Sequence, residues 1–238
     1  MAPIRPSSET KPHYMKSMFG RIASRYDLLN TVMTGGRHHA WRSQALRWVN
    51  PRDLETALDV GCGTADFALA LSRYRVKHTV GLDIARPMLD VGQEKLTRQN
   101  MRDSIDLVVG DASRLPFPDA SFDITVTAFT LRNVPDVELA LSEMLRVTRP
   151  GGRMVSLDIV KRNPGILDPI LRIYFHRIMP LLGSLVAGDR EAYTYLPDSV
   201  DAFLSTTELS NLMERVGFKN VRSRNFALGT VAIHMGET

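Results

Sequence analysis

The sequence predicts an α/β fold in which helices cover both faces of a doubly wound, mostly parallel sheet of seven strands. Two observations predict this class. Short apolar strands alternate with amphipathic helices along residues 56–160, which is typical of a parallel sheet. A glycine-rich turn, Gly61-Cys62-Gly63, follows the first of these strands. The chain of 238 residues is long enough for one such domain with a full core, which we expect at residues 14–238.

The segment before the sheet divides into a tail and two helices. Residues 1–13 are rich in proline and small polar residues, which predicts a disordered N-terminal tail. Apolar residues then recur at helical spacing from Tyr14 to Val49, and Gly35-Gly36 interrupts them. We expect these two helices to lie over one edge of the sheet.

The central region alternates regularly between strands and helices. Its apolar runs predict strands at residues 56–60, 78–82, 105–109, 122–128 and 153–160. Its amphipathic runs predict helices at residues 64–73, 86–99 and 135–148. Between the last helix and the last strand, the sequence Arg-Pro-Gly-Gly at residues 149–152 predicts a turn.

The C-terminal third begins with an interruption. Residues 163–205 are apolar and punctuated by proline, and we interpret them as a helical insertion on the substrate side. A last helix is expected at residues 206–216, with Thr206 or Thr207 as its N-cap. Two strands should then pair as a hairpin at the edge of the sheet, near residues 218–224 and 226–234.

Composition limits the classes of function. The net charge of +4 is spread along the chain without a run of five Lys or Arg, which favours a solvated basic surface over nucleic-acid binding. Cys62 is the only cysteine, so neither a disulfide framework nor a Cys-rich zinc site is expected, and a cytoplasmic location fits best. His38 and His39 have no third ligand at metal spacing, so no metal site is predicted.

The turn after the first strand has the features of a ligand-binding loop. Residues 59–66 read DVGCGTAD. The glycines let the backbone approach a ligand closely and adopt φ values that other residues avoid. Asp83 ends the second strand, 22 residues after Gly61, where a carboxylate can bind the diol of a ribose.

Two classes of ligand use this layout. A dinucleotide needs a third glycine at position 66, where this chain has Asp66, and that carboxylate would repel a pyrophosphate. S-adenosylmethionine has no phosphate, and its ammonium and sulfonium attract carboxylates such as Asp59. Each of these aspartates is common by itself at a strand end or a helix start. Together with Asp83 they favour S-adenosylmethionine.

A third element agrees with that ligand. Gly110-Asp111-Ala112 follows the third strand, where a carboxylate and a backbone amide can contact the edge of an adenine. Alone the segment would be an ordinary polar turn. Its agreement with the other two elements gives it weight.

Several longer runs resemble a known family. ALDVGCGTADFALALSR, DASRLPFPDASFD and LRVTRPGGR resemble the Rossmann-like class I methyltransferases. MFGRIASRYDLLNTVM, TLRNV and GSLVAGDREAYTYLPDSV are more selective, and they resemble the C-methyltransferases of menaquinone and ubiquinone biosynthesis. The resemblance runs from Met18 to His234, nearly the whole chain.

The resemblance implies S-adenosylmethionine as cofactor. Family members often have Ser in place of Ala128, so a contact there would be made by the backbone. They often have Gly in place of Ala65, which we expect to adopt a helix-start conformation. The cofactor contacts that the resemblance implies are Thr64, Asp83, Asp111 and Ala112.

The resemblance also implies the reaction, which is methylation of a ring carbon of a polyprenylated quinol, with demethylmenaquinol as the leading substrate. Arg132 and Asn133 follow the fourth strand, where Arg132 would hold the developing oxyanion or an activated water. His176 is the candidate proton acceptor. The alternatives are an arginine paired with a nearby acid, an asparagine near a helix N-cap and a packed histidine.

Aromatic residues are candidates for the substrate pocket. Tyr193 and Tyr195 would line the ring pocket, and Tyr26 would belong to a lid, although all three could simply pack. The apolar insertion would supply a channel for the prenyl tail, a homodimer interface or sheet packing. A lipid substrate would bring a peripheral membrane contact. An O- or N-methyltransferase, a nonenzymatic nucleotide-binding domain and a dinucleotide dehydrogenase remain alternatives.

Overall fold

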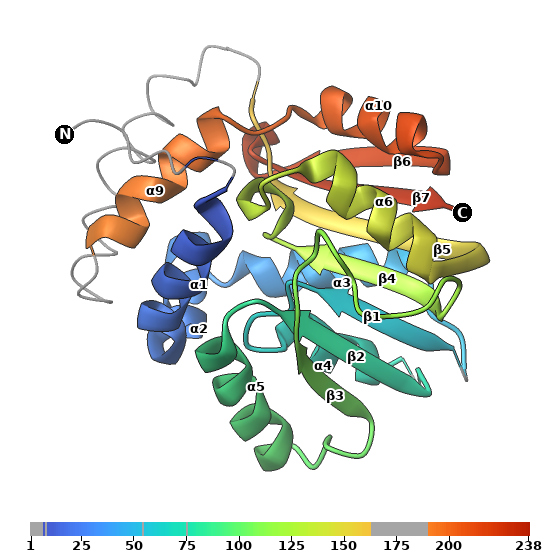
Figure 1. Cartoon of the computed structure of the whole chain (residues 1–238), viewed down its shortest axis with the longest axis horizontal. Coiled ribbons are helices and arrows are strands. Elements are labelled where there is room, and N and C mark those ends of the chain that lie inside the picture. Colours follow the sequence, from blue (N-terminus) through green and yellow to red (C-terminus); the bar gives the residue numbers. More distant parts are fainter. Residues whose placement is uncertain (1–6, 8, 54, 75, 163–189) are drawn as a thin grey trace.

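The computed structural model describes residues 7, 9–53, 55–74, 76–162 and 190–238, and only the backbone of residues 190–194 and 196. Its centre is one seven-stranded sheet with the order β3-β2-β1-β4-β5-β7-β6 (Figure 1). The first five strands in this order are parallel, whereas β7 is antiparallel to both β5 and β6. The strands are β1 (Thr56–Val60), β2 (His78–Asp83), β3 (Ile105–Val109), β4 (Phe122–Ala128), β5 (Thr148–Ile159), β6 (Lys219–Phe226) and β7 (Val231–Glu237).

Helices cover both faces of this sheet, so the predicted doubly wound α/β class is confirmed. One face packs against two helices, α6 (Val137–Val147) and α10 (Thr206–Val216), around Leu58, Val60 and Leu82. The other face packs against α3 (Arg37–Val49), α4 (Asp66–Ser72) and α5 (Arg86–Arg98). The central strands β1 and β4 are short apolar runs with both faces buried, as central parallel strands require, whereas the edge strand β6 is largely exposed.

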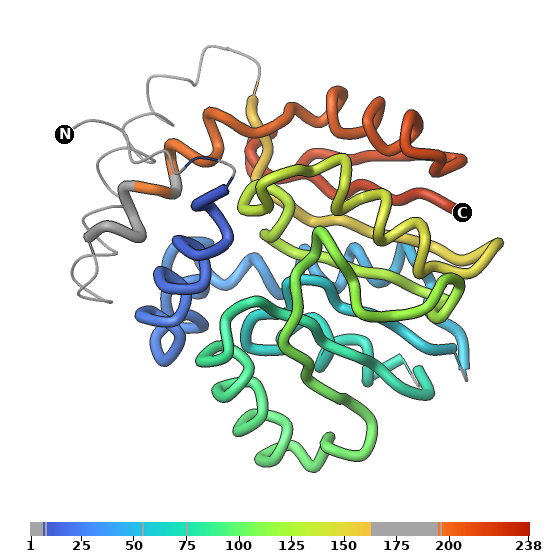
Figure 2. The backbone as a smooth tube through the Cα atoms, in the orientation of Figure 1, coloured from blue at the N-terminus to red at the C-terminus, as the bar shows by residue number. Residues whose placement is uncertain are grey.

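A separate group of helices stands beside one end of the sheet. It contains α1 (Lys11–Ile22), the 3₁₀ turn η1 (Ala23–Arg25), α2 (Tyr26–Thr34) and α9 (Arg190–Asp201). Although α1 and α9 are far apart in the sequence, they lie side by side (Figure 2). A small apolar core joins these helices, formed by Met15, Met18, Ile22, Leu29 and Tyr195.

Several predicted boundaries differ from the structure, and three of these differences have a clear physical reason. Helix α1 begins at Lys11, inside the predicted tail 1–13, because Pro12 suits the first turn of a helix and the next turns bury their methionines. The N-cap of α10 is Ser205, which forms a capping box with Glu208. The predicted turn at residues 149–152 belongs to β5 as an irregularity.

That irregularity is a shift of register between β4 and β5. Phe122 pairs with Thr148, whereas Ile124 pairs with Arg153. Gly151 adopts a φ of +75° within the extra residues, which is a conformation that glycine tolerates. The Pro-Gly-Gly sequence therefore marks a bulge rather than a strand boundary.

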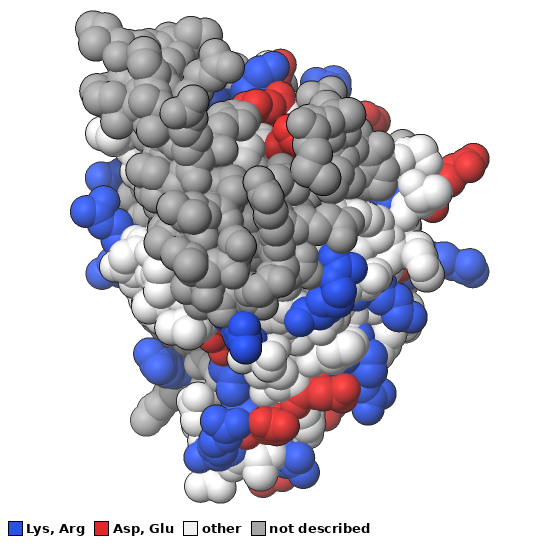
Figure 3. All heavy atoms as spheres, turned by 90° about the vertical axis from the view of Figure 1, so that its left-hand side faces the viewer, with Lys and Arg blue, Asp and Glu red and all other residues white. Residues whose placement is uncertain are grey.

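The predicted insertion at 163–205 is described only from residue 190, where α9 begins. Among the described residues, no helix is long and apolar enough to cross a membrane. Among the described residues of the face beside α1 and α2, Lys and Arg side chains occur at several separate places (Figure 3).

Candidate active site

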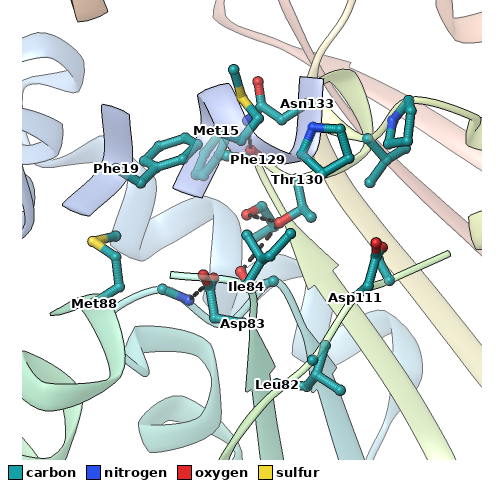
Figure 4. A pocket seen from close by; sticks show the side chains of 18 of the residues that line it. Met15, Phe19, Leu82, Asp83, Ile84, Met88, Asp111, Phe129, Thr130 and Asn133 are labelled. Atoms are coloured by element: carbon teal, nitrogen blue, oxygen red, sulfur yellow. Dashed lines mark hydrogen bonds between the residues drawn. The ribbon is translucent and has the colours of Figure 1, made fainter. Parts of the chain in front are cut away.

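The first cavity lies where the parallel strands end, beneath α1. Its floor comes from the loops after β1, β2, β3 and β4, and its roof comes from residues of α1, α2 and α5 (Figure 4). This is the edge at which open α/β sheets bind ligands. The predicted cofactor residues that line it are Gly61, Gly63, Asp83, Asp111, Ala112 and Ala128.

The glycine loop is tied to the end of β2. The amides of Gly61 and Cys62 both donate to the carbonyl of Leu82, at 2.7 and 2.9 Å. Gly61 has a φ of +69°, and a Cβ atom there would lie 2.3 Å from the side chain of Thr130. Only glycine therefore lets the loop pass this close to the end of β4.

Asp83 is fixed in the wall of the first cavity. Its Oδ2 accepts from the Gly63 amide and its Oδ1 accepts from the Ala85 amide, both at 2.8 Å. Burial raises the pKa of Asp83, and these backbone donors oppose that effect. A carboxylate has more acceptor sites than these two bonds use, so Asp83 can still accept from hydroxyl groups of a ligand.

The first cavity is acidic. Asp111 is the second carboxylate in its wall, and its Oδ1 accepts from the Ser113 amide at 2.8 Å. No Lys, Arg or His occurs among the described residues that line the cavity. Such a site favours a cationic ligand over a pyrophosphate.

The prediction that Asp66 would repel a pyrophosphate bound at the glycine loop is wrong, although other carboxylates at the site have that effect. Asp66 does not line the first cavity but pairs with Lys95 at 2.5 Å. Burial alone would raise the pKa of Asp66, but Arg42 and Lys95 outweigh it and lower the pKa. Asp83 and Asp111, rather than Asp66, supply the charge that disfavours a dinucleotide.

Two other predicted contacts lie behind the cavity wall. Asp59 is 1% exposed and accepts from the Ala68 amide at 3.0 Å, and burial raises its pKa to about 7. Its other oxygen has no partner among the described residues. Thr64 is also buried, and its hydroxyl donates to Asp27 at 2.5 Å. The side chains of Asp59 and Thr64 therefore support the loop from behind.

Ala65 does not adopt the expected helix-start conformation. Its φ of +66° and ψ of +23° are left-handed, and α4 begins only at Asp66. A left-handed conformation costs about 1–2 kcal/mol for a residue other than glycine. Glycine would adopt this conformation without that strain.

A second cavity adjoins the first. The two share four lining residues, Phe19, Tyr26, Phe129 and Asn133. The remainder of the second cavity is mainly apolar and comes from α1, α2 and the end of β5, with Met18, Ile22, Leu29, Met33 and Ile159. Ligands bound in the two cavities would therefore face each other at these shared residues.

Arg132 lines the second cavity but is paired. Its Nη1 lies 2.6 Å from Asp158 Oδ1, and both side chains are buried. Burial raises the pKa of Asp158, and Arg132 opposes that effect. The structure therefore agrees with the alternative expectation for Arg132, an arginine paired with a nearby acid, and the pair with Asp158 is buried. The Nε of Arg132 has no partner among the described residues.

Asn133 offers a buried acceptor at the wall between the cavities. Its Nδ2 donates to the carbonyl of Phe129 at 3.0 Å, and the side chain is 8% exposed. Its Oδ1 has no partner among the described residues. Buried acceptors are rarely left unpaired, so a ligand group is a natural donor for this oxygen.

Aromatic residues form the rest of the shared wall. Burial raises the pKa of Tyr26, and it raises the pKa of Tyr195, which lines the second cavity, to about 12. Phe129 has a φ of +60°, and its ring lies 5.4 Å from the guanidinium of Arg42 and 5.9 Å from that of Arg132. Backbone strain of this kind is typical of functional sites.

Not every candidate can be located. His176 and the side chain of Tyr193 lie outside the described residues. Sequence reasoning missed Phe19, Phe129 and Asp158, because neither an aromatic residue on a helix or after a strand nor an acid within a strand carries a motif. Within the described part of the chain, no group of three or more His, Cys, Asp or Glu could hold a metal ion.

Solved structures with this fold include S-adenosylmethionine-dependent methyltransferases. One is a possible histamine N-methyltransferase from Thermotoga maritima, with a TM-score of 0.67, 21% identity and coverage of 94% of this chain and 99% of that one. The cyclase SpnF gives a TM-score of 0.72 at 18% identity, covering 98% and 97%. At such low identity these likenesses concern the fold alone. The fold and the acidic first cavity are consistent with one class of protein, the class I S-adenosylmethionine-dependent methyltransferases.

Sequence comparison narrows the class to a family. Residues 7–238 match the model of the ubiE/COQ5 methyltransferase family. A demethylmenaquinone methyltransferase of Roseiflexus castenholzii is 40% identical, over 98% of this chain and 97% of the relative. A ubiquinone/menaquinone biosynthesis C-methyltransferase of Brucella suis is 36% identical, over 95% and 86%. The chain belongs to the ubiE/COQ5 methyltransferase family, as its resemblance predicted.

Proposed function

We propose that this protein transfers a methyl group from S-adenosylmethionine, bound in the first cavity, to a ring carbon of demethylmenaquinol, bound in the second. The observation that carries the proposal is the pair of adjoining cavities, one acidic and one apolar, with four shared residues. Relatives at 35–40% identity bear the name demethylmenaquinone methyltransferase, and others at 35–36% bear the name ubiquinone/menaquinone biosynthesis C-methyltransferase. Menaquinone biosynthesis is common to both names, which supports the naphthoquinol ring.

The residues of the first cavity suit S-adenosylmethionine, which supplies an electrophilic methyl group. Asp83 would accept from its ribose hydroxyls. Asp111, together with the backbone beside Ala112, would contact its adenine. The two carboxylates balance the positive charge of the methionine end, and Gly61 and Gly63 leave room for it.

The second cavity suits a prenylated ring. Its apolar wall excludes water, which strengthens every polar contact made inside it. Asn133 Oδ1 would accept from a ring hydroxyl and so fix the orientation of the ring. Arg132 Nε would donate to the oxygen that becomes negative as the ring carbon becomes nucleophilic.

Other roles stay predictions. The ring carbon becomes nucleophilic when the neighbouring hydroxyl is deprotonated, and His176 is our candidate to accept that proton. The proton that the methylated carbon then loses restores the hydroxyl, so one proton is released overall. Tyr193 and Tyr195 would contact the ring or its tail. A prenyl tail would also bring the protein to a membrane surface from a cytoplasmic location, and a homodimer formed through the insertion is a further prediction.

The test is turnover with labelled S-adenosylmethionine. The panel contains short-tailed demethylmenaquinol, a matched prenylated benzoquinol, and phenol and amine acceptors of other methyltransferases. We expect carbon-bound label in the naphthoquinol, located by mass spectrometry and NMR, and almost none with Asp83→Ala. Preference for the benzoquinol would correct the ring. Label on oxygen or nitrogen alone, or in no acceptor, would overturn the proposal.

A further inference from the structure

A buried polar cluster lies behind the glycine loop, outside both cavities. We call it the anchor cluster. It joins the N-terminal helices to the loop and to the helices beneath the sheet, because its members come from α2, α3, the β1–α4 region and α5. The anchor cluster consists of Asp27, Arg42, Thr64, Asp66 and Lys95.

Lys95 is the centre of the cluster. Its ammonium donates to Asp27 Oδ2 at 2.8 Å, to Thr64 Oγ1 at 3.1 Å and to Asp66 Oδ1 at 2.5 Å. An ammonium has three protons, so all of them are used. The Lys95 side chain is 16% exposed and that of Asp66 is 17% exposed, so this pair is stronger than one on the surface. The Asp27 side chain is 39% exposed, so solvent screens its pair with Lys95 more.

Asp27 brings the cluster next to the wall that the two cavities share. Its Oδ1 accepts from Thr64 at 2.5 Å and its Oδ2 accepts from Lys95. Asp27 is adjacent to Tyr26, which lines both cavities, and Thr64 is adjacent to Gly63, whose amide binds Asp83. The same contacts thus fix the positions of Tyr26, which lies beside the proposed quinol site, and of the glycine loop, which lies beside the proposed methyl-donor site.

Arg42 extends the cluster to the second aromatic of the shared wall. Its Nη1 lies 3.9 Å from Asp66 Oδ2, and its guanidinium lies 5.4 Å from the centre of the Phe129 ring. His38 Nδ1 lies 2.6 Å from the same nitrogen, and burial together with Arg42 lowers the pKa of His38 to about 4. His38 is therefore neutral, and two carboxylates balance two cations in the cluster.

We propose that Lys95 and Asp27 are positioning residues for methyl transfer. They hold Tyr26 in register with the glycine loop, so that the ligands of the two cavities meet at reacting distance. This inference rests on the proposed function. The chemical reason is that one ammonium binds carboxylates from α2 and α4 at once. Without it, Asp27 and Asp66 repel each other and α2 moves away from the loop.

The test compares Lys95→Met with the wild type. The glycine loop keeps its own bonds to Leu82 and Asp83, so we expect affinity for S-adenosylhomocysteine to change by less than about threefold. We expect kcat to fall by about 30-fold, because a displacement near 1 Å can slow catalysis by two orders of magnitude. Lys95→Arg should recover most of the loss. In Lys95→Met, adding Asp27→Asn should recover part of it by removing the repulsion.

A matched control is available in the same chain. Glu55 and Arg153 form another ion pair with largely buried side chains, 2.5 Å apart; Glu55 directly precedes β1, and neither residue lines either cavity. Glu55→Gln should lower the melting temperature as Lys95→Met does, without changing kcat. If Lys95→Met lowers only the melting temperature, like Glu55→Gln, the positioning role is overturned. Should Lys95→Met fail to fold, Asp27→Asn alone carries the same comparison.

Hydrogen exchange separates this inference from the proposed function, because it needs no turnover. We expect Lys95→Met to speed exchange of the amides of α2 and to leave β1 and β4 unchanged. A wild type that methylates no quinol would refute the proposed function, while the exchange of α2 would still report on the anchor. Unchanged exchange in α2 together with unchanged kcat would overturn the positioning role proposed for Lys95 and Asp27.

Discussion

The two cavities share a wall, yet they are built differently. The first is formed mainly by four strand-end loops, and its carboxylates are held by backbone amides two to twenty residues away. The second is formed by α1, α2, η2 (Leu131–Asn133), the end of β5 and α9, which are distant in the sequence. A binding site fixed by local hydrogen bonds leaves a sequence motif, whereas one fixed by packing between distant helices leaves almost none.

The sharpest test of this contrast is Asp83→Ala, for which we expect the largest effect. Removing the carboxylate deletes the acceptor for ribose and frees the amides of Gly63 and Ala85. Affinity for S-adenosylhomocysteine, measured by calorimetry, should fall by about 100-fold. Binding of a quinol analogue should change little. Unchanged affinity for S-adenosylhomocysteine would mean that the donor binds elsewhere.

The second test concerns Asp59, behind the first cavity. Burial raises its pKa to about 7, whereas in the unfolded chain it is about 4. Folding therefore favours its neutral form, and that stability is fully present below about pH 4 and lost as the pH rises through about 7. Urea unfolding of the ligand-free protein should show a loss of up to about 1.4 kcal/mol per pH unit in this window.

Asp59→Asn serves as the comparison for that measurement. Because Asn does not titrate, the variant should lack this component of the pH dependence while keeping the others. Parallel curves for the two proteins between about pH 4 and pH 7 would show that Asp59 ionises normally in the folded state.

A third test uses matched methionines. Met33 lines only the second cavity and Met88 only the first. Met33→Trp should fill part of the second cavity and raise the KM for quinol about tenfold, with affinity for S-adenosylhomocysteine unchanged. Met88→Trp should do the reverse. If both variants weaken both ligands equally, the cavities do not act as separate sites.

The smallest expected effect is that of Ala65→Gly. Glycine relieves left-handed strain but removes a buried methyl and loosens the unfolded chain, and each of these changes is about 1 kcal/mol. The free energy of unfolding should therefore change by less than about 1 kcal/mol. Ala68 is buried within α4, where there is no such strain, so Ala68→Gly should lower the free energy of unfolding by more. An equal loss for both would argue against strain at Ala65.

The fold was largely predictable because several of its strands have a clear sequence pattern. β1, β3 and β4 are short apolar runs between turn residues, and their bounds match the predicted ones. β5 was predicted to begin at Arg153, and the bulge before it was missed, because Pro-Gly-Gly indicates a turn and a bulge equally well. The start of α1 was missed because its burial depends on distant contacts.

For the site, sequence reasoning found positions better than side-chain directions. Asp83 and Asp111 were predicted from spacing and do line the first cavity. Asp66 and Thr64 were expected near the ligand, but the left-handed turn at Ala65 sends both toward Lys95. No local pattern reveals that turn, since alanine seldom adopts it.

The contact between α1 and η2 has a consequence for how the protein is made. Lys11 donates to the carbonyls of Arg132 and Val134, at 3.1 and 2.7 Å, and α1 roofs the first cavity. On the ribosome, Lys11 is synthesised more than a hundred residues before these partners. A nascent chain that has reached β3 already carries Asp83, the glycine loop and α5, against which α1 packs, yet it still lacks both carbonyls that accept from Lys11. The first cavity can therefore be completed only during the second half of translation.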